Sequence, residues 1–145
     1  MQVNQPMFVL QRRINHPLEA VERVLCDPAT SRAPATLPLG DGFDLALERS
    51  FGVMFPPFGV EHASWCAPAQ VSTRRGRTIE RFEIEINAWD DRSTELLVRP
   101  RAKHPHRWSG RRMRRYFDVA HATADSLTCR IGTRAAASRR TPSLV

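Results

Sequence analysis

The fold of this chain is decided by residues 109–132, SGRRMRRYFDVAHATADSLTCRIG. Ser109 can cap the first backbone N–H groups of a helix, and Gly132 is a typical C-terminal stop. Between them, apolar residues recur at steps of three and four positions: Met113, Tyr116, Phe117, Ala120, Ala124, Leu127 and Ile131. The spacing predicts a helix of about 22 residues, which is ~33 Å long at the α-helical rise. Its apolar stripe needs an apolar surface to lie on.

A predicted β-sheet upstream supplies that surface. Residues 79–89 alternate strictly, with Phe82, Ile84 and Ile86 on one face of a strand and acidic side chains on the other. A polar hairpin turn follows at residues 90–93. Further strands are predicted at residues 43–48, 51–55, 60–66, 69–74 and 94–99. The sheet is therefore dry on one face and wet on the other.

The chain opens with a strand and then a helix. Residues 7–14 carry β-favouring types with Phe8, Leu10 and Ile14 on one face. Asn15 is predicted to cap the helix, Pro17 fits its first turn, and the Asp27-Pro28 pair ends it. Residues 28–42, which hold three prolines, predict a long connection to which no regular structure is assigned.

A chain of 145 residues is long enough for one domain with its own core and too short for two. Consecutive antiparallel strands followed by a long helix indicate the α+β class. We place the domain at residues 1–132. Residues 133–145 have little to bury, and we interpret them as a basic, flexible tail.

Residues 12–30 read RRINHPLEAVERVLCDPAT: a strand, a proline-started helix with a V-x-x-V-L stripe, and a D-P stop. This stretch, and the order of elements over residues 7–131, resemble the START-like (SRPBCC) helix-grip superfamily, which includes polyketide cyclase/dehydrase-type and lipid-transfer proteins. The resemblance implies a curved antiparallel sheet wrapped around the long C-terminal helix, with the short helix after the first strand. It also implies a cavity between sheet and helix that binds a small hydrophobic or amphipathic molecule.

Carried onto this sequence, the resemblance assigns ligand binding to the dry strand face and the helix stripe. The residues are Phe43, Leu45, Trp65, Phe82, Ile84, Ile86, Met113, Tyr116 and Phe117. The same side chains would fill a solid core equally well, so both interpretations stay open. A cyclase- or dehydratase-like activity is within the range of the family, but no catalytic motif and no cofactor motif identifies one here.

The formal charge of +7 is distributed unevenly. Residues 1–98 hold 10 arginines against 13 acidic residues, whereas residues 99–145 hold 12 basic residues against two aspartates. We interpret the densest part, residues 99–115, as an anion-binding strip made by Arg99, Arg101, Arg107, Arg111, Arg112 and Arg115. The helical arginines also fit the solvated side of the helix.

Three kinds of partner follow from these features. The strip would receive the acidic head group of the ligand or a membrane surface. The alternative is a nucleic-acid-associated module that binds phosphates through residues 99–115 and the tail. A homodimer through the helix stripe or an open sheet edge is a third hypothesis.

The remaining polar residues give weaker indications of a functional site. Glu83 and Glu85 belong on the wet face, while Glu61 or His62 could point into the cavity. His104 and His106 stand two apart, but no third ligand follows at metal spacing, so no metal site is predicted.

The three cysteines are widely spaced without a C-x-x-C motif, and we expect them to be buried free thiols. No run of 18 apolar residues predicts a transmembrane segment, and no signal peptide is recognisable, so a cytoplasmic protein is expected.

Overall fold

The computed structural model describes residues 8–27, 36–40, 42–54 and 64–140. Its elements are β1 (Leu10–Ile14), α1 (Leu18–Cys26), β2 (Thr36–Gly40), β3 (Phe43–Leu47), β4 (Gly52–Met54), β5 (Ser64–Thr73), β6 (Thr78–Ala88), β7 (Thr94–Pro100), the short 3-10 helix η2 (Pro105–Arg107) and α3 (Gly110–Arg140). The predicted class is confirmed: the chain is an α+β protein with a curled antiparallel sheet, a long C-terminal helix and a short helix after the first strand.

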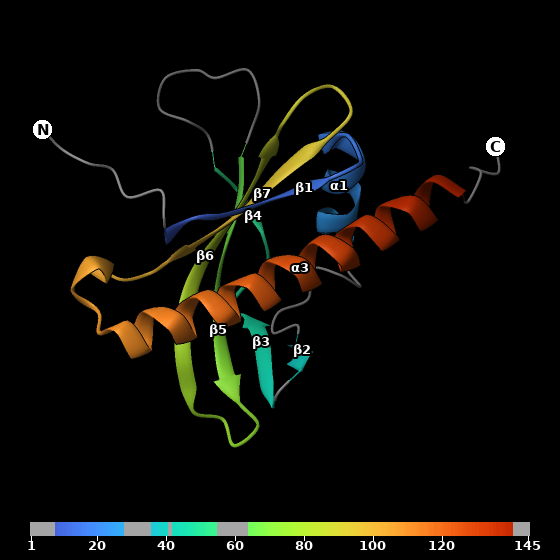
Figure 1. Ribbon diagram of the computed structural model, residues 1–145. Coiled ribbons are helices and arrows are strands. Elements are labelled where there is room, and N and C mark those ends of the chain that lie inside the picture. The colour runs from blue at the N-terminus through green and yellow to red at the C-terminus, as the bar shows by residue number, and fades with distance from the viewer. Residues whose placement is uncertain (1–7, 28–35, 41, 55–63, 141–145) are drawn as a thin grey trace, which may run out of the picture.

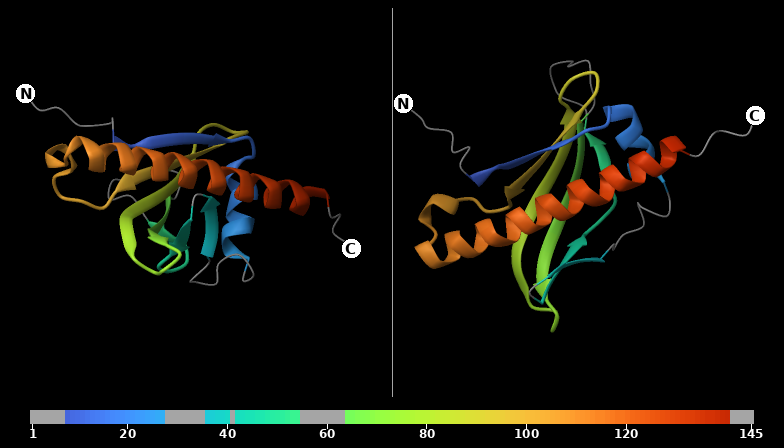
Figure 2. Two further views of the ribbon diagram at one scale, coloured as in Figure 1. Left: turned by 60° about the horizontal axis from the view of Figure 1, so that its bottom comes forward. Right: turned by 45° about the vertical axis from the view of Figure 1, so that its right-hand side comes forward.

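All strands pair antiparallel, in the order β1-β7-β6-β5-β3-β2, and β4 pairs with β5. The sheet curls, and α3 crosses its concave side diagonally (Figure 1). Figure 2 shows the same crossing from below, with the strands bending around the helix. The predicted hairpin between β6 and β7 is confirmed by the Asp90 carboxylate, which accepts hydrogen bonds from the Arg92 N–H at 2.8 Å and the Ser93 hydroxyl at 2.7 Å.

The core lies where α3 meets β6. On the concave face of β6, Phe82, Ile84 and Ile86 are fully buried, as the strict alternation predicts. On α3, Tyr116, Ala120 and Ala124 are also fully buried. The backbone of α3 comes closest to β1, β7 and β2, and large side chains fill the space between α3 and β6, where the Phe82 and Tyr116 ring centroids lie 5.6 Å apart. The predicted contact between the helix stripe and the dry face of the sheet therefore forms.

Helix α1 begins without a side-chain cap. The predicted cap by Asn15 is wrong, because Pro17 occupies the N-cap position and its carbonyl accepts hydrogen bonds from the N–H groups of Ala20 and Val21 at 3.0 and 3.2 Å. Proline is already extended at this position, with ψ of 156°, so the backbone enters the helix without a capping side chain. The helix ends at Cys26, before Pro28, as predicted.

The connection at residues 28–42 contains a strand that the sequence does not predict. β2 pairs with β3 and is the last strand in the sheet order, where Pro38 is tolerated because an edge strand can lack one donor. The φ angles of Gly40 and Gly42 are +85° and +82°, a left-handed conformation that favours glycine and turns the chain from β2 into β3.

β5 is one continuous strand, so the prediction of two short strands is wrong where it separates residues 66 and 69. Pro68 lies inside β5, between the residues that pair with β4 and those that pair with β3. Its carbonyl accepts a hydrogen bond from the Glu48 N–H at 2.9 Å, where β3 has ended. The backbone position at which Pro68 lacks an N–H therefore has no strand residue paired with it on that side. As a result, β5 continues through Pro68 without a break. Residues 60–63 of the predicted strand lie outside the described residues.

Helix α3 is longer than predicted. It runs through Gly132 to Arg140, so the predicted stop at Gly132 is wrong, and residues 133–140 of the predicted tail are helical. Ala135 is fully buried, and this packing offsets the roughly 1 kcal/mol that glycine costs inside a helix. Residues 141–145 lie outside the described residues. Among the described residues, no helix is both long enough and apolar enough to cross a membrane.

The extension of α3 predicts that Ala135→Asp destabilises the protein by about 3 kcal/mol, because an unpaired carboxylate would be buried. Thr133→Asp is the matched control, since it adds the same charge at an exposed position of the same helix. Urea unfolding followed by circular dichroism measures both variants. Equal unfolding midpoints for the two would show that α3 does not pack beyond Gly132.

Candidate functional site

The central residues of the predicted ligand wall are packed against one another. Phe82, Ile84, Ile86 and Tyr116 have no exposed surface. The Tyr116 hydroxyl donates a 2.6 Å hydrogen bond to the carbonyl of Phe8, and burial raises the pKa of this phenol. Phe82, Ile84 and Ile86 form the surface on which α3 lies, and Tyr116 is the α3 side chain that packs on Phe82.

Three further residues of the predicted wall lie at the margin of this core. The Trp65 indole N–H donates to the Glu22 carboxylate at 2.9 Å, which ties β5 to α1. Phe117 stacks on Phe8 with ring centroids 6.1 Å apart, and Met113 is half-buried beside the core. Each of the three already has a packing partner within the chain.

Phe43 and Leu45, the remaining two, line pockets between β3 and α3. Leu45 belongs to an apolar pocket of about 40 Å³, lined by Val24, Leu25, Leu37, Leu45, Leu47, Phe51, Leu127, Arg130, Ile131 and Arg134. Phe43 belongs to a pocket of about 500 Å³ at the start of α3, lined by Phe43, Gly110, Arg111, Arg114, Arg115, Asp118 and Val119. The two pockets share no lining residue, and we refer to them together as the α3–β3 groove.

The arginines of the predicted anion-binding strip do not act as one surface. On the convex side of the sheet, Arg99 pairs with Glu85 at 2.9 Å, and Arg101 pairs with Glu48 at 2.8 Å. The hydrogen bond from Arg101 lowers the pKa of the Glu48 carboxyl. Both arginines are therefore occupied by carboxylates of the chain itself.

Arg112 and Arg115 face a buried carboxylate. The Glu80 side chain is only 2% exposed, and its Oε1 lies 3.5 Å from Arg112 Nε and 3.6 Å from Arg115 Nη2. The Arg112 guanidinium also covers the ring of Trp108, 4.2 Å from its centroid. The interaction joins the start of α3 to β6.

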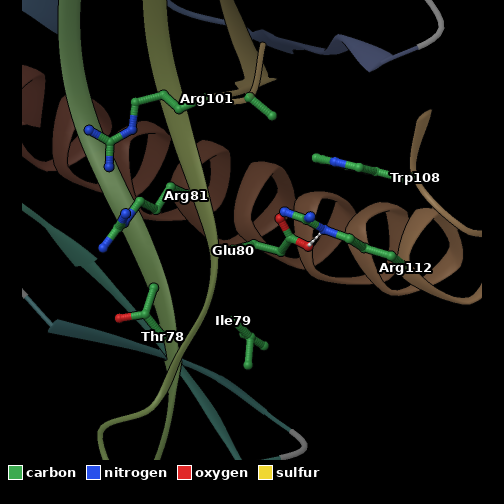
Figure 3. Close-up of a pocket in the computed structure, with 8 residues that line it drawn as sticks. Thr78, Ile79, Glu80, Arg81, Arg101, Trp108 and Arg112 are labelled. Carbon is green, nitrogen blue, oxygen red and sulfur yellow. Dashed lines mark hydrogen bonds and ion pairs between the residues drawn. The ribbon is translucent and has the colours of Figure 1, made fainter. Parts of the chain in front are cut away.

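A polar pocket of about 280 Å³ opens beside this pair (Figure 3). Glu80, Trp108 and Arg112 lie on one side of it, while the guanidinium groups of Arg81 and Arg101 point away from Glu80. The pocket follows the edge of β6 beyond the point where β7 ends, since Phe82 pairs with Pro100 and only the Arg101 N–H continues to Arg81.

The other two strip residues, Arg107 and Arg111, are exposed. Neither makes an ion pair with an acid of the described residues. The structure therefore divides the six arginines into four that pair with Glu85, Glu48 and Glu80, and two that remain available to a partner.

The sequence prediction missed Glu80 and Arg114. Glu80 has the same parity as Phe82, Ile84 and Ile86, so the alternation of β6 already places it on the dry face. This position in the alternation is the sequence signal that could have identified Glu80. Arg114 lines the groove because it lies one turn after Arg111 on α3, a contact that depends on how the helix is turned over β3.

Other predicted polar sites are distributed as follows. Glu83 and Glu85 lie on the wet face, where Cys66 Sγ donates to Glu83 at 3.3 Å. The rings of His104 and His106 lie 5.6 Å apart, and no group of three or more metal-ligating side chains occurs among the described residues. Glu61 and His62 lie outside the described residues.

Comparison with known proteins assigns neither a family nor a function to the chain. No family model matches the chain, and no curated protein matches it. Among solved structures it is similar to a conserved protein from Geobacillus kaustophilus, at 15% identity and a TM-score of 0.43, over 88% of this chain and 93% of that one. This likeness identifies neither a family nor a ligand.

The burial of Glu80 predicts an asymmetric mutational response. Arg112→Gln with Arg115→Gln should cost about 3 kcal/mol, because a buried carboxylate loses both cations. Adding Glu80→Met to these two changes should restore most of that loss, since an apolar side chain fills the site without a charge. Urea unfolding measures all three forms, and a triple variant as unstable as the double one would refute the coupling.

The thiols should differ in reactivity. Burial, reinforced by the neighbouring Glu83, raises the pKa of the Cys66 thiol to about 11. Cys26 and Cys129 are exposed, contrary to the expectation that all three thiols are buried. Iodoacetamide at pH 8 should therefore alkylate Cys26 and Cys129 well before Cys66, because only the thiolate reacts. Peptide mass spectrometry over a time course shows the order, and early labelling of Cys66 would contradict it.

Proposed function

We propose that this protein binds a small amphipathic molecule in the α3–β3 groove. The observation that carries the proposal is the composition of the groove, in which an apolar interior is bordered by arginines. On β3, Phe43, Leu45 and Leu47 line it, and on α3, Val119, Leu127 and Ile131 do so. Sites for small molecules are typically apolar with a few polar groups that orient the ligand.

The two ends of the groove suit different parts of such a molecule. The apolar pocket of about 40 Å³ takes the end of an alkyl chain. The pocket of about 500 Å³ at the start of α3 has room for a head group. Val119 and Leu127 are eight residues apart on α3, which is about 12 Å along the helix axis. A molecule with a chain of about that length would reach from one pocket into the other.

The size of the hydrophobic term supports a measurable affinity. Burying a methylene group contributes about 0.8 kcal/mol, so six to eight buried groups give roughly 5–6 kcal/mol before the cost of immobilising the ligand. A charged hydrogen bond to an arginine adds about 1.5–3 kcal/mol. Together these terms give roughly 7–9 kcal/mol, and immobilising the ligand removes at least about 4 kcal/mol of this, which leaves dissociation constants in the submillimolar to millimolar range.

A second candidate function is nucleic-acid binding, which the exposed cations Lys103, Arg107, Arg111 and Arg114 favour. Two observations weigh against it. Trp108 is covered by Arg112 and is not free to stack on a base. Asp118 follows on the same helix and is exposed, so it limits the basic surface at the start of α3. Binding to RNA or DNA that weakens steeply with salt would support this candidate over the first.

Dodecanoate is a suitable probe of the groove. The wild-type protein should bind it saturably, with submillimolar to millimolar affinity, in isothermal titration calorimetry. Phe43→Asp should weaken binding at least tenfold, because it places a carboxylate on the groove wall that repels both the chain and the head group.

Val53→Asp provides the matched control for this experiment. Val53 is 41% exposed on β4, outside the groove, so the variant makes the same change of charge and should bind like the wild type. Thermal unfolding confirms that both variants are folded. Absence of saturable binding to the wild type, or equal affinity of the two variants, would overturn the proposal.

A further inference from the structure

We infer that the head group held at the start of α3 is a compact dianion of the phosphate monoester class, bound by Arg111, Arg114 and Arg115. This inference rests on the proposed function and specifies its ligand. It concerns the larger pocket of the α3–β3 groove, which Phe43 closes on the β3 side.

The charges around this pocket leave a surplus of about two. Arg111, Arg114 and Arg115 line it together with one carboxylate, that of Asp118. None of the three arginines pairs with Asp118 within 4 Å, and the only acid that pairs with any of them in the described part of the chain is Glu80. Arg111 and Arg114 are thus both available. A carboxylate would occupy one guanidinium group, whereas a dianion with three terminal oxygens can engage two or three.

Folding alone does not account for these cations. The first turn of α3 contains no acidic residue, although the positive end of the helix dipole favours one. Arg112 and Arg115 are explained by Glu80, which they neutralise. Arg111 and Arg114 have no such counterpart among the described residues, and they increase the repulsion at this helix end. Their placement is unfavourable for the isolated chain and favourable once an anion is bound.

Arg115 lies between the buried carboxylate of Glu80 and the larger pocket of the groove. It lines the groove and lies 3.6 Å from Glu80, so its guanidinium is held between the buried carboxylate and the pocket. Arg112 is held on the other side, over Trp108, where it lines the polar pocket beside β6 (Figure 3). The dianion site therefore consists of two available arginines and one that is already oriented.

The test compares dodecyl phosphate, dodecanoate and inorganic phosphate by isothermal titration calorimetry at pH 8, where a phosphate monoester is dianionic. Dodecyl phosphate should bind at least tenfold more tightly than dodecanoate. In Arg111→Gln with Arg114→Gln, this preference should disappear. The same variant should be at least as stable to heat as the wild type, because repulsion at the helix end is relieved.

The control variant is Arg74→Gln with Arg75→Gln, which removes two exposed arginines from the β5–β6 turn and makes the same change in net charge. It should retain the preference for the phosphate ester. An equal loss of preference in the control variant would overturn the inference, because it would show a long-range charge effect rather than a site.

The other outcomes separate the inference from the proposed function. Equal affinity for dodecyl phosphate and dodecanoate would overturn the dianion site and leave the groove intact. Inorganic phosphate binding as tightly as dodecyl phosphate would support the dianion site and refute the contribution of the groove. No binding by any of the three probes would overturn both.

Discussion

The packing of α3 across the concave face of the sheet is the contact on which the rest of the structure depends. Tyr116, Ala120 and Ala124 bring the helix onto the fully buried side chains of β6. The same helix also packs against α1, β1, β7 and β2, so both ends of the sheet order are held by one element. Because the sheet is curled, its edges approach the helix backbone most closely, and the side chains of the central strand fill the space beneath the helix.

The buried carboxylate of Glu80 explains why two arginines lie at the start of α3. Burial of an unpaired charge is costly, and two arginines at the start of α3 offset it. These ion pairs fix the end of the helix at which the larger pocket opens. The charged residues of this region therefore divide into those that hold the helix in place and those that remain open to a ligand, a distinction that net charge alone does not reveal.

The sequence predicts the elements whose pattern is local. The alternation of β6 and the stripe of α3 are strong because both elements are half-buried, and the cap by Ser109 is confirmed by its hydroxyl, which accepts the Arg112 N–H at 3.2 Å. β2 was missed because it lies at an edge, is partly exposed and contains Pro38. The passage of β5 through Pro68 depends on where two other strands end. Likewise, the pairing of Arg101 with Glu48 joins residues distant in sequence, so no spacing rule indicates it.

The glycine inside α3 divides that helix into parts of unequal local stability. Among residues 133–137, the part beyond Gly132 whose side chains are described, only Ala135 is fully buried, whereas the turns before Gly132 are anchored by several buried side chains. The last turns should thus exchange their amide protons faster than the central ones, since helix opening there breaks few contacts. Arg130 and Ile131, which line the narrow end of the groove, lie at this boundary. A ligand in the groove would consequently slow the exchange of amide protons in the last turns of α3, far from the head group.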